Sequence, residues 1–178
     1  MKAERDFLVQ KLKDAGIHGK IHESMKSLKN CNEVHVGAVL RTGEDFTRSG
    51  SKKKYTDQEG QRKQRNKLFE RTSELHIVIA DTDEAKVEEI LTNFLKSISK
   101  GLEVNGNWVD IEIGKADWVE GDDSILKSKI AVEFDVILTG GIYVDTDVIT
   151  AKIGSIEAKR IGGSTWKDKK RNIQPLKN

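Results

Sequence analysis

Apolar and polar residues alternate with a period of two between Leu126 and Leu138. Apart from Ser128, the even positions are apolar, whereas the odd positions are mainly Lys, Glu and Asp. This alternation predicts a long β-strand with one buried face and one face exposed to water. A one-sided strand needs a second layer of structure over its apolar face.

A helical pattern downstream of residue 80 predicts that second layer. Apolar residues recur at spacings of three and four, at Val87, Ile90, Leu91, Phe94, Leu95 and Ile98. This spacing forms the apolar stripe of an amphipathic helix. Asp81 is expected to cap the start of the helix, Glu84 occupies the capping-box position, and Gly101 is expected to end it. The pattern therefore predicts a helix packed on a sheet.

Shorter patterns predict the other elements. A first helix is expected at residues 3–15, with Gly16 as its stop signal. Asn105-Gly106 predicts a hairpin turn, and Gly140-Gly141 is expected to end or bend the long strand. Strands are expected at 33–41, 68–80, 102–104 and 108–113, and residues 17–23 are ambiguous, with an edge strand as one interpretation. These elements predict an α+β fold with a mostly antiparallel sheet, an amphipathic helix on one face and an N-terminal helix.

Two polar segments fall outside this framework. Residues 41–66 hold three glycines, many charges and only two aromatic residues, so they are expected to form a long basic loop between two antiparallel strands. Residues 146–178 are rich in lysine and are expected to form an extended C-terminal arm, with a candidate strand at 148–153. Residues 1–145 are then expected to form a single α+β domain.

The charge is unevenly distributed along the chain. Residues 41–66 carry eight Lys or Arg against four Asp or Glu, and residues 152–178 carry eight against two. Since the whole chain has a net charge of +2, the remainder is near −8. This segregation suits head-to-tail contact between identical subunits, or a basic loop that faces a polyanion. The alternative, equally favoured, is that polar segments are simply lysine-rich and solvated.

The spacing of three histidines and the one cysteine resembles that of a zinc site. A structural site would need His18, His22, Cys31 and His35 to converge in a tetrahedron. Gly19 argues against the helix that would place the first two histidines on one face. Surface histidines with a small buried cysteine are therefore favoured, and no metal site or other cofactor is predicted.

No catalytic motif is found in the sequence. The segment 49–52 lacks the spacing of a phosphate-binding loop, and neither a nucleophile elbow nor a His-Glu-x-x-His helix is present. The carboxylate pairs Asp122-Asp123 and Asp145/Asp147 lie at predicted turns, where Asp is favoured for backbone reasons. No apolar run reaches the roughly 20 residues that span a bilayer. The chain is not predicted to be an enzyme or to enter a membrane, and its single cysteine suits a reducing cytoplasm.

Trp108 falls on the polar face of its predicted strand, together with Asp110 and Glu112. Aromatic residues are enriched at protein interfaces, so these three residues are a candidate subunit interface. Core packing on the second side of the sheet is the alternative for the tryptophan.

Several segments resemble one family of assembly proteins. They are AVLRTGEDFTRSGSKK from residue 38, KLFERTSELHIVIADTD from 67, NGNWVDIEIGKADWVE from 105 and TGGIYVD from 139. With the order of elements over about residues 1–145, they resemble the tail terminator proteins of long-tailed, in particular contractile, bacteriophages and of phage-tail-like bacteriocins. The arm has no counterpart in this resemblance.

The resemblance implies a structural role in the virion tail, assembled in the cytoplasm of the bacterial host. Such proteins form a ring, usually a hexamer, that caps the head-proximal end of the tail tube, stops its growth and presents a surface to the head connector. The ring can also contact the sheath, and DNA passes through it without being read. On this basis the basic loop faces the lumen, the tube or DNA through Arg41, Arg48, Lys52, Lys53, Lys54, Arg62, Lys63 and Arg65. A closed ring also needs two different surface patches that meet, which segregated charge provides.

Other functions stay open at this point. One is a head–tail completion or neck protein of the same particle, since similar folds serve at several levels of the neck. Another is a nucleic-acid-binding protein that uses the two basic segments. A hydrolase or nuclease has no sequence feature in its favour.

Overall fold

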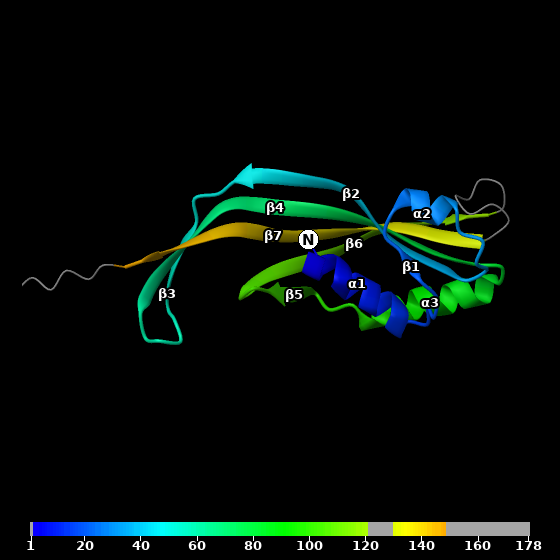
Figure 1. Ribbon diagram of the computed structural model, residues 1–178, viewed down its shortest axis with the longest axis horizontal. Coiled ribbons are helices and arrows are strands. Elements are labelled where there is room, and N and C mark those ends of the chain that lie inside the picture. The colour runs from blue at the N-terminus through cyan, green and yellow to red at the C-terminus, as the bar shows by residue number, and fades with distance from the viewer. Residues whose placement is uncertain (1, 121–129, 149–178) are drawn as a thin grey trace, which may run out of the picture. The chain divides into compact units, whose positions relative to one another are not determined.

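The computed structural model describes residues 2–120 and 130–148, shown in Figure 1 with their elements labelled. They form an α+β fold in which a mostly antiparallel, curled sheet, a half-barrel, packs against helices. The fold class predicted from the sequence is therefore confirmed. The elements are α1 (Lys2–Asp14), β1 (Ile21–His22), α2 (Met25–Lys29), β2 (Val36–Arg48), β3 (Lys52–Thr56), β4 (Arg62–Asp81), α3 (Glu84–Ser97), β5 (Gly101–Val104), β6 (Asn107–Val119) and β7 (Ile130–Asp147).

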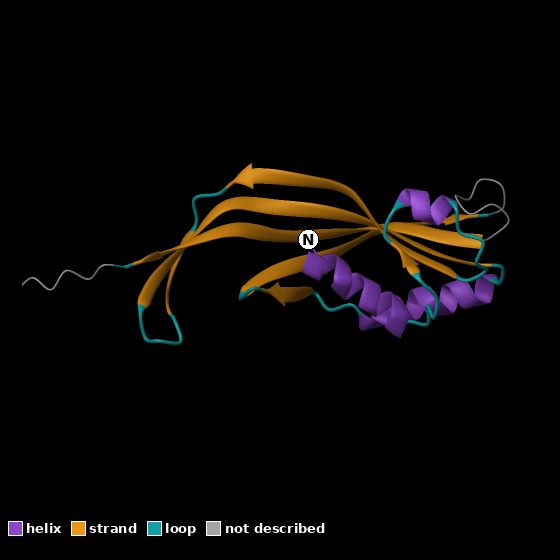
Figure 2. Cartoon of the chain, in the orientation of Figure 1, coloured by secondary structure: helices purple, strands orange, loops and turns teal. Residues whose placement is uncertain are grey.

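A single sheet of seven strands organises these residues. Its strand order is β1-β2-β4-β7-β6-β5, and β3 pairs with β4 off this path. The β1–β2 pair is parallel, and the other pairs among the described residues are antiparallel. β4 lies between β2 and β7, in a central place in the sheet. Figure 2 shows the helices on part of the sheet and the strands continuing past them.

The main core lies between the sheet and the helices α1 and α3. Phe94 of α3 and Phe134 of β7 are almost fully buried, and their ring centroids lie 5.7 Å apart. Leu8 and Leu12 of α1 join the same cluster. The predicted period-two pattern of the long strand and the helical stripe of α3 thus meet in one core. Residues 126–129 of the predicted strand lie outside the described residues.

A second, smaller core lies on the other face of the sheet, under α2. Leu28 packs there with Val36 and Ala38 of β2 and with Val78 and Ala80 of β4. Because one stretch of β2 and β4 is covered on both faces, its residues form continuous apolar runs and do not alternate.

The N-cap of α3 lies two residues after Asp81, the residue expected from the sequence. Asp83 is the N-cap, and its carboxylate accepts a hydrogen bond from the backbone N–H of Ala85 at 3.1 Å. Asp81 accepts from the backbone N–H groups of Thr82 and Asp83 and binds His35, so it anchors the turn that precedes the helix. Both aspartates suit an N-cap, and only the observed turn distinguishes them.

Two glycine predictions also need correction. Gly101 does not end α3 but begins β5, where a Cβ would lie 2.5 Å from the carbonyl oxygen of Val109. β7 runs through Gly140 and Gly141 and ends at Asp147. By contrast, the hairpin turn is confirmed: Asn105 and Gly106 have φ values of 52° and 73°, as a two-residue type I′ turn requires.

The prediction of a long loop at residues 41–66 is wrong, because most of this segment forms strands. β2 continues to Arg48, β3 follows at Lys52–Thr56, and β4 begins at Arg62. The segment does join two antiparallel strands, as expected. It has no core of its own, but its backbone groups pair with neighbouring strands, and these hydrogen bonds order a sequence too polar to fold by burial.

The chain divides into a compact unit that ends at Val148 and a separate segment of residues 149–178. The predicted arm and its candidate strand therefore lie almost entirely outside the described residues.

Candidate functional site

The feature that distinguishes this sheet is a strand extension that none of the described helices covers. We call it the tip: β3, residues 62–66 of β4, residues 143–147 at the end of β7 and Val148, which follows β7 (Figure 1). Every β3 residue except the half-buried Tyr55 is exposed. Six of the eight basic residues predicted to face a partner lie here, and Arg41 and Arg48 lie on β2.

Arg65 holds the tip together. Its guanidinium binds both carboxylate oxygens of Asp145, at 2.8 and 2.7 Å, and also donates to the carbonyl oxygen of Gly106 and to Asn107 Oδ1. The hydrogen bond from Arg65 lowers the pKa of Asp145 to about 2, and the same contact raises the pKa of Arg65. The guanidinium also lies 5.1 Å from the ring centroid of Tyr55. Arg65 therefore links β4 to β7 and to the β5–β6 turn, and its hydrogen-bonding capacity is largely used within the chain.

Three more of the predicted cations have partners within the chain. Lys63 forms an ion pair with Asp57 at 3.0 Å, and the hydrogen bond that it donates to Asp57 raises the pKa of the lysine. Arg41 forms an ion pair with Glu44 on the same strand. The guanidinium of Arg48 lies over the ring of Phe69, 5.1 Å from its centroid.

The remaining four cations, Lys52, Lys53, Lys54 and Arg62, are exposed. Within the part of the chain that the structure describes, none of them forms an ion pair. These residues are the ones available to an outside partner.

Strand register separates these cations onto two faces. Residues paired across strands share a face, and successive residues alternate between faces. Lys52, Lys54 and Arg62 therefore share one face, which we call the basic face. Their cross-strand neighbours on that face are uncharged: Asn66, Gln64 and Thr56 on the adjacent strands, then Val144 and Thr146 on β7. Lys53 lies on the opposite face, with Arg65 and Asp145.

The basic face carries positive charge and no carboxylate among these described positions. Such a surface attracts phosphates or acidic protein surfaces over about 8–10 Å at physiological ionic strength. It offers charge without a fixed pattern of donors, so it favours binding that does not depend on sequence.

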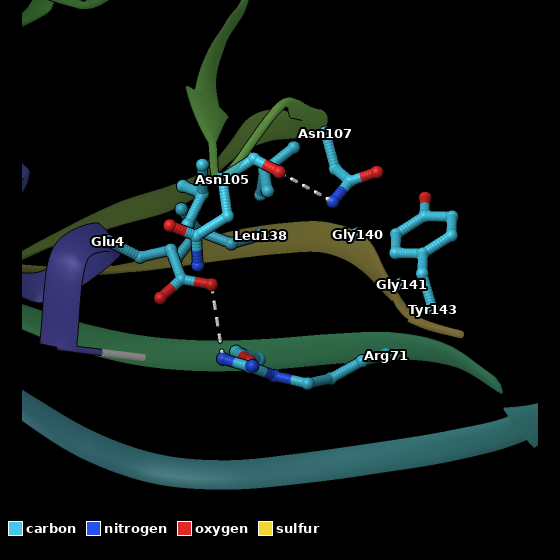
Figure 3. Close-up of a pocket in the computed structure, with 11 residues that line it drawn as sticks. Glu4, Arg71, Asn105, Asn107, Leu138, Gly140, Gly141 and Tyr143 are labelled. Carbon is cyan, nitrogen blue, oxygen red and sulfur yellow. Dashed lines mark hydrogen bonds and ion pairs between the residues drawn. The ribbon is translucent and has the colours of Figure 1, made fainter. Parts of the chain in front are cut away.

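A cavity of about 320 Å³ lies beside the base of the tip, between α1 and the sheet (Figure 3). Figure 3 shows Glu4 of α1 facing Arg71 of β4, whose Nη2 lies 3.1 Å from a Glu4 oxygen. Arg71 also contacts Glu44 of β2 at 3.3 Å. The charged groups of this cavity thus pair with one another and fasten the start of α1 to the sheet. Sequence patterns missed this role because Glu4 and Arg71 are 67 residues apart.

The structure places the candidate interface residues on β6. Trp108 is 56% exposed, and its Nε1 donates to Asp110 Oδ1 at 2.8 Å. Its ring lies over Gly101 of β5, and Glu112 is exposed two residues beyond Asp110. The alternative of core packing for Trp108 is therefore wrong, and the three residues form an exposed strip.

The four residues weighed as a zinc site do not converge. His35 is engaged by Asp81 at 2.8 Å and by the Gly16 carbonyl oxygen at 3.0 Å, and His18 is exposed and stacks on it. His22 and Cys31 lie together, but with Glu33 as the third neighbour. Of the carboxylate pairs, Asp145 binds Arg65, and Asp122-Asp123 lie outside the described residues.

No protein-family model matches the chain, and a search of curated protein sequences finds no match. Among the described residues, every helix is too short or too polar to cross a membrane.

Proposed function

We propose that this chain is a structural virion-assembly protein of the tail-terminator type. It forms a ring, hexameric on the pattern of that family, that caps the head-proximal end of a tail tube, stops its growth and receives the head connector. The observation that carries the proposal is the tip: an uncovered β extension, fixed by Arg65 and Asp145, that presents a basic face. The resemblance of residues 1–145 to tail terminator proteins indicates the kind of particle, a phage tail or a tail-like bacteriocin.

The division of the described residues into core and tip supports this role. The sheet with α1 and α3 supplies a packed body that can serve as a ring wall. A ring of six subunits would present six copies of the basic face to the tube protein or to DNA in the lumen. Contacts of this kind neutralise phosphates without reading bases, as passage of a whole genome requires.

Two open strand edges give a physical route to ring closure. β1 covers β2 only at Gly37 and Ala38. β5 covers β6 only up to Asp110, and the backbone N–H of Ile111 donates one further hydrogen bond to the Lys100 carbonyl oxygen, just before β5. The rest of β2 and of β6 therefore has unpaired outer edges among the described residues, on opposite sides of the sheet. Opposite and different edges suit a head-to-tail interface, which closes into a ring. The strip of Trp108, Asp110 and Glu112 runs along β6 from the part paired with β5 to the open part, which begins before Glu112, and it is the proposed subunit contact.

A direct test locates the chain on the particle. An epitope-tagged chain is expressed in the bacterial host that produces the tails, and purified tails are labelled and viewed by electron microscopy. Label at the head-proximal end alone supports either a terminator or a neck protein. A host that lacks the chain separates the two, because only loss of a terminator should give tubes of uncontrolled length. Tails without label would overturn both assembly roles. The sheath and the connector are then tested as neighbours by cross-linking.

The basic face favours one second candidate, non-specific binding of nucleic acid as the main function. This function predicts tight binding of duplex DNA with a steep dependence on salt, about −0.9 in the log–log slope per phosphate contacted. Duplex DNA that does not bind at physiological salt would remove this candidate and leave the assembly role intact.

A further inference from the structure

A second cluster of chemically active side chains lies far from the tip, around α2. His22 belongs to β1, Cys31 follows α2, and Glu33 lies in the segment before β2. One ring nitrogen of His22, the Cys31 sulfur and a Glu33 carboxylate oxygen all lie within 4.8 Å of one another. The proposed function makes no use of these residues.

His22 is held as a metal ligand would be. The side chain is 94% buried, and its Nδ1 lies 2.7 Å from Ser27 Oγ. With the ring proton on Nδ1 and donated to Ser27, Nε2 carries a free lone pair. Nε2 is buried and has no hydrogen-bond partner among the described residues. A buried polar nitrogen without a partner is costly, and an ion would supply one. The hydrogen bond at the other nitrogen is the kind that orients metal-binding histidines.

Cys31 and Glu33 complete a donor set that suits one class of metal. The backbone N–H of Glu33 lies 3.4 Å from Cys31 Sγ and donates to it, so the sulfur is held beside the Glu33 backbone. Imidazole nitrogen, thiolate sulfur and carboxylate oxygen are the ligands of Zn²⁺, at about 2.0–2.3 Å from the ion. Two ligand atoms of a tetrahedral ion lie about 3.5 Å apart at those bond lengths. Each pair of ligand atoms therefore needs to come closer by about 1.3 Å at most.

The surroundings leave room for a fourth ligand. The three residues line one open depression, together with Lys20, Ser24 and Asn30. Solvent therefore reaches the site, and water can take the remaining position of the tetrahedron.

We propose that His22, Cys31 and Glu33 bind a zinc-class divalent ion, with water as the fourth ligand. The ion ties the two-residue edge strand β1 to the segment that leads into β2. This region has little packing of its own, because α2 has five residues and Leu28 is its one buried residue. The role is structural, and it is independent of the proposed assembly function.

The test uses the full chain, stripped of metal and then titrated with Co²⁺ as a spectroscopic substitute for Zn²⁺. We expect one ion per chain, a thiolate-to-cobalt charge-transfer band in the near ultraviolet, and loss of the band when Zn²⁺ is added. Cys31→Ser should abolish the band, and Glu33→Gln should weaken Zn²⁺ binding at least tenfold. His18→Gln is the matched control, since His18 is exposed and outside the cluster, and it should bind as the wild type does.

Circular dichroism of each variant without metal checks that the fold is intact. Glu33 is exposed, so its variant keeps the test valid even if the buried His22 tolerates no change. A wild-type chain without the charge-transfer band, or a Cys31→Ser chain with unchanged Zn²⁺ affinity, would overturn the proposal.

Discussion

Phe94 and Phe134 join the helix to the sheet at the scale of single side chains. Both are buried, at 0% and 2% exposure, and their rings pack tilted against each other. We expect Phe94→Ala or Phe134→Ala to lower the free energy of unfolding by about 3–5 kcal/mol, because each leaves a cavity in a packed core. Urea denaturation measures the change. Phe46→Ala is the control, since Phe46 is 52% exposed and should cost about 0.5 kcal/mol or less. A change under about 1 kcal/mol for both core variants would contradict this core.

The ion pair between Asp145 and Arg65 predicts a pH dependence. Arg65 holds the pKa of Asp145 at about 2, below its ordinary value near 3.9. A carboxylate with a lowered pKa in the folded state stabilises the fold above its unfolded pKa, and the effect disappears as pH falls through the folded pKa. The stabilisation should therefore be complete above about pH 4 and be lost towards pH 2.

Asp145→Asn isolates this contribution from those of other carboxylates. Urea midpoints of the wild type and the variant should differ at pH 6 and converge as the pH falls below about 2, because the wild-type carboxyl then becomes neutral as well. A gap that stays constant over this range would show that the ion pair does not stabilise the folded state.

At the scale of whole elements, α3 depends on its first turn. Asp83 accepts a hydrogen bond from the N–H of Ala85, one of the four donors that have no partner within the helix. Asp83→Ala should cost about 1 kcal/mol in urea denaturation, and Asp83→Ser should restore most of it, since serine also caps. Equal stability of the alanine variant and the wild type would mean that the cap contributes nothing.

The elements that periodicity marks clearly could be predicted, and those that depend on distant pairing could not. The stripe from Val87 to Ile98 gave α3, and the alternation ending at Leu138 gave the main part of β7. Residues 41–66 were predicted as a loop because their composition supports no core. Composition measures what a segment can bury, whereas the hydrogen bonds of β2 and β3 to β4 come from partners elsewhere in the chain.

The candidate site shows the same division. Composition correctly marked residues 41–66 as basic, but only the strand register separates Lys52 and Lys54 from Lys53. Arg65 looked like the other cations in the sequence, and its partner Asp145 is 80 residues away. The zinc-like spacing included His22 and Cys31 among four residues, and a metal site was not favoured. The spacing did not include Glu33, because a lone glutamate in the segment before β2 forms no pattern.

At the scale of the whole molecule, the basic face can be tested without disturbing the fold. Lys52, Lys54 and Arg62 are exposed and form no ion pair among the described residues, so replacing all three with Ala should change stability by no more than about 0.5 kcal/mol each. The same variant should reduce the yield of infectious or bactericidal particles severalfold. If the chain binds duplex DNA, the salt slope should also become shallower by about one for each phosphate that the variant no longer neutralises.

A control variant with the same change in net charge separates the effect of the basic face from that of total charge. Lys13, Lys29 and Lys100 are also exposed and lie outside the tip, and their replacement by Ala should leave particle yield unchanged. Equal particle yields from the two triple variants would show that the basic face has no specific role in particle assembly.

The long pairing of β7 with β4 has a mechanical consequence. The two strands pair from Lys63 opposite Asp147 to Asp81 opposite Ile130, with one register shift between Lys67 and Phe69, and their hydrogen bonds run perpendicular to the strand direction. Tension applied to the chain at Asp147 along the strand axis therefore loads the whole ladder in shear, so many bonds must break together. The short β3, in contrast, is held to β4 over five residues and can peel away bond by bond. A particle that pulls on this chain from the end of β7 would therefore need a large force to separate the strands, whereas a small force on β3 would detach it.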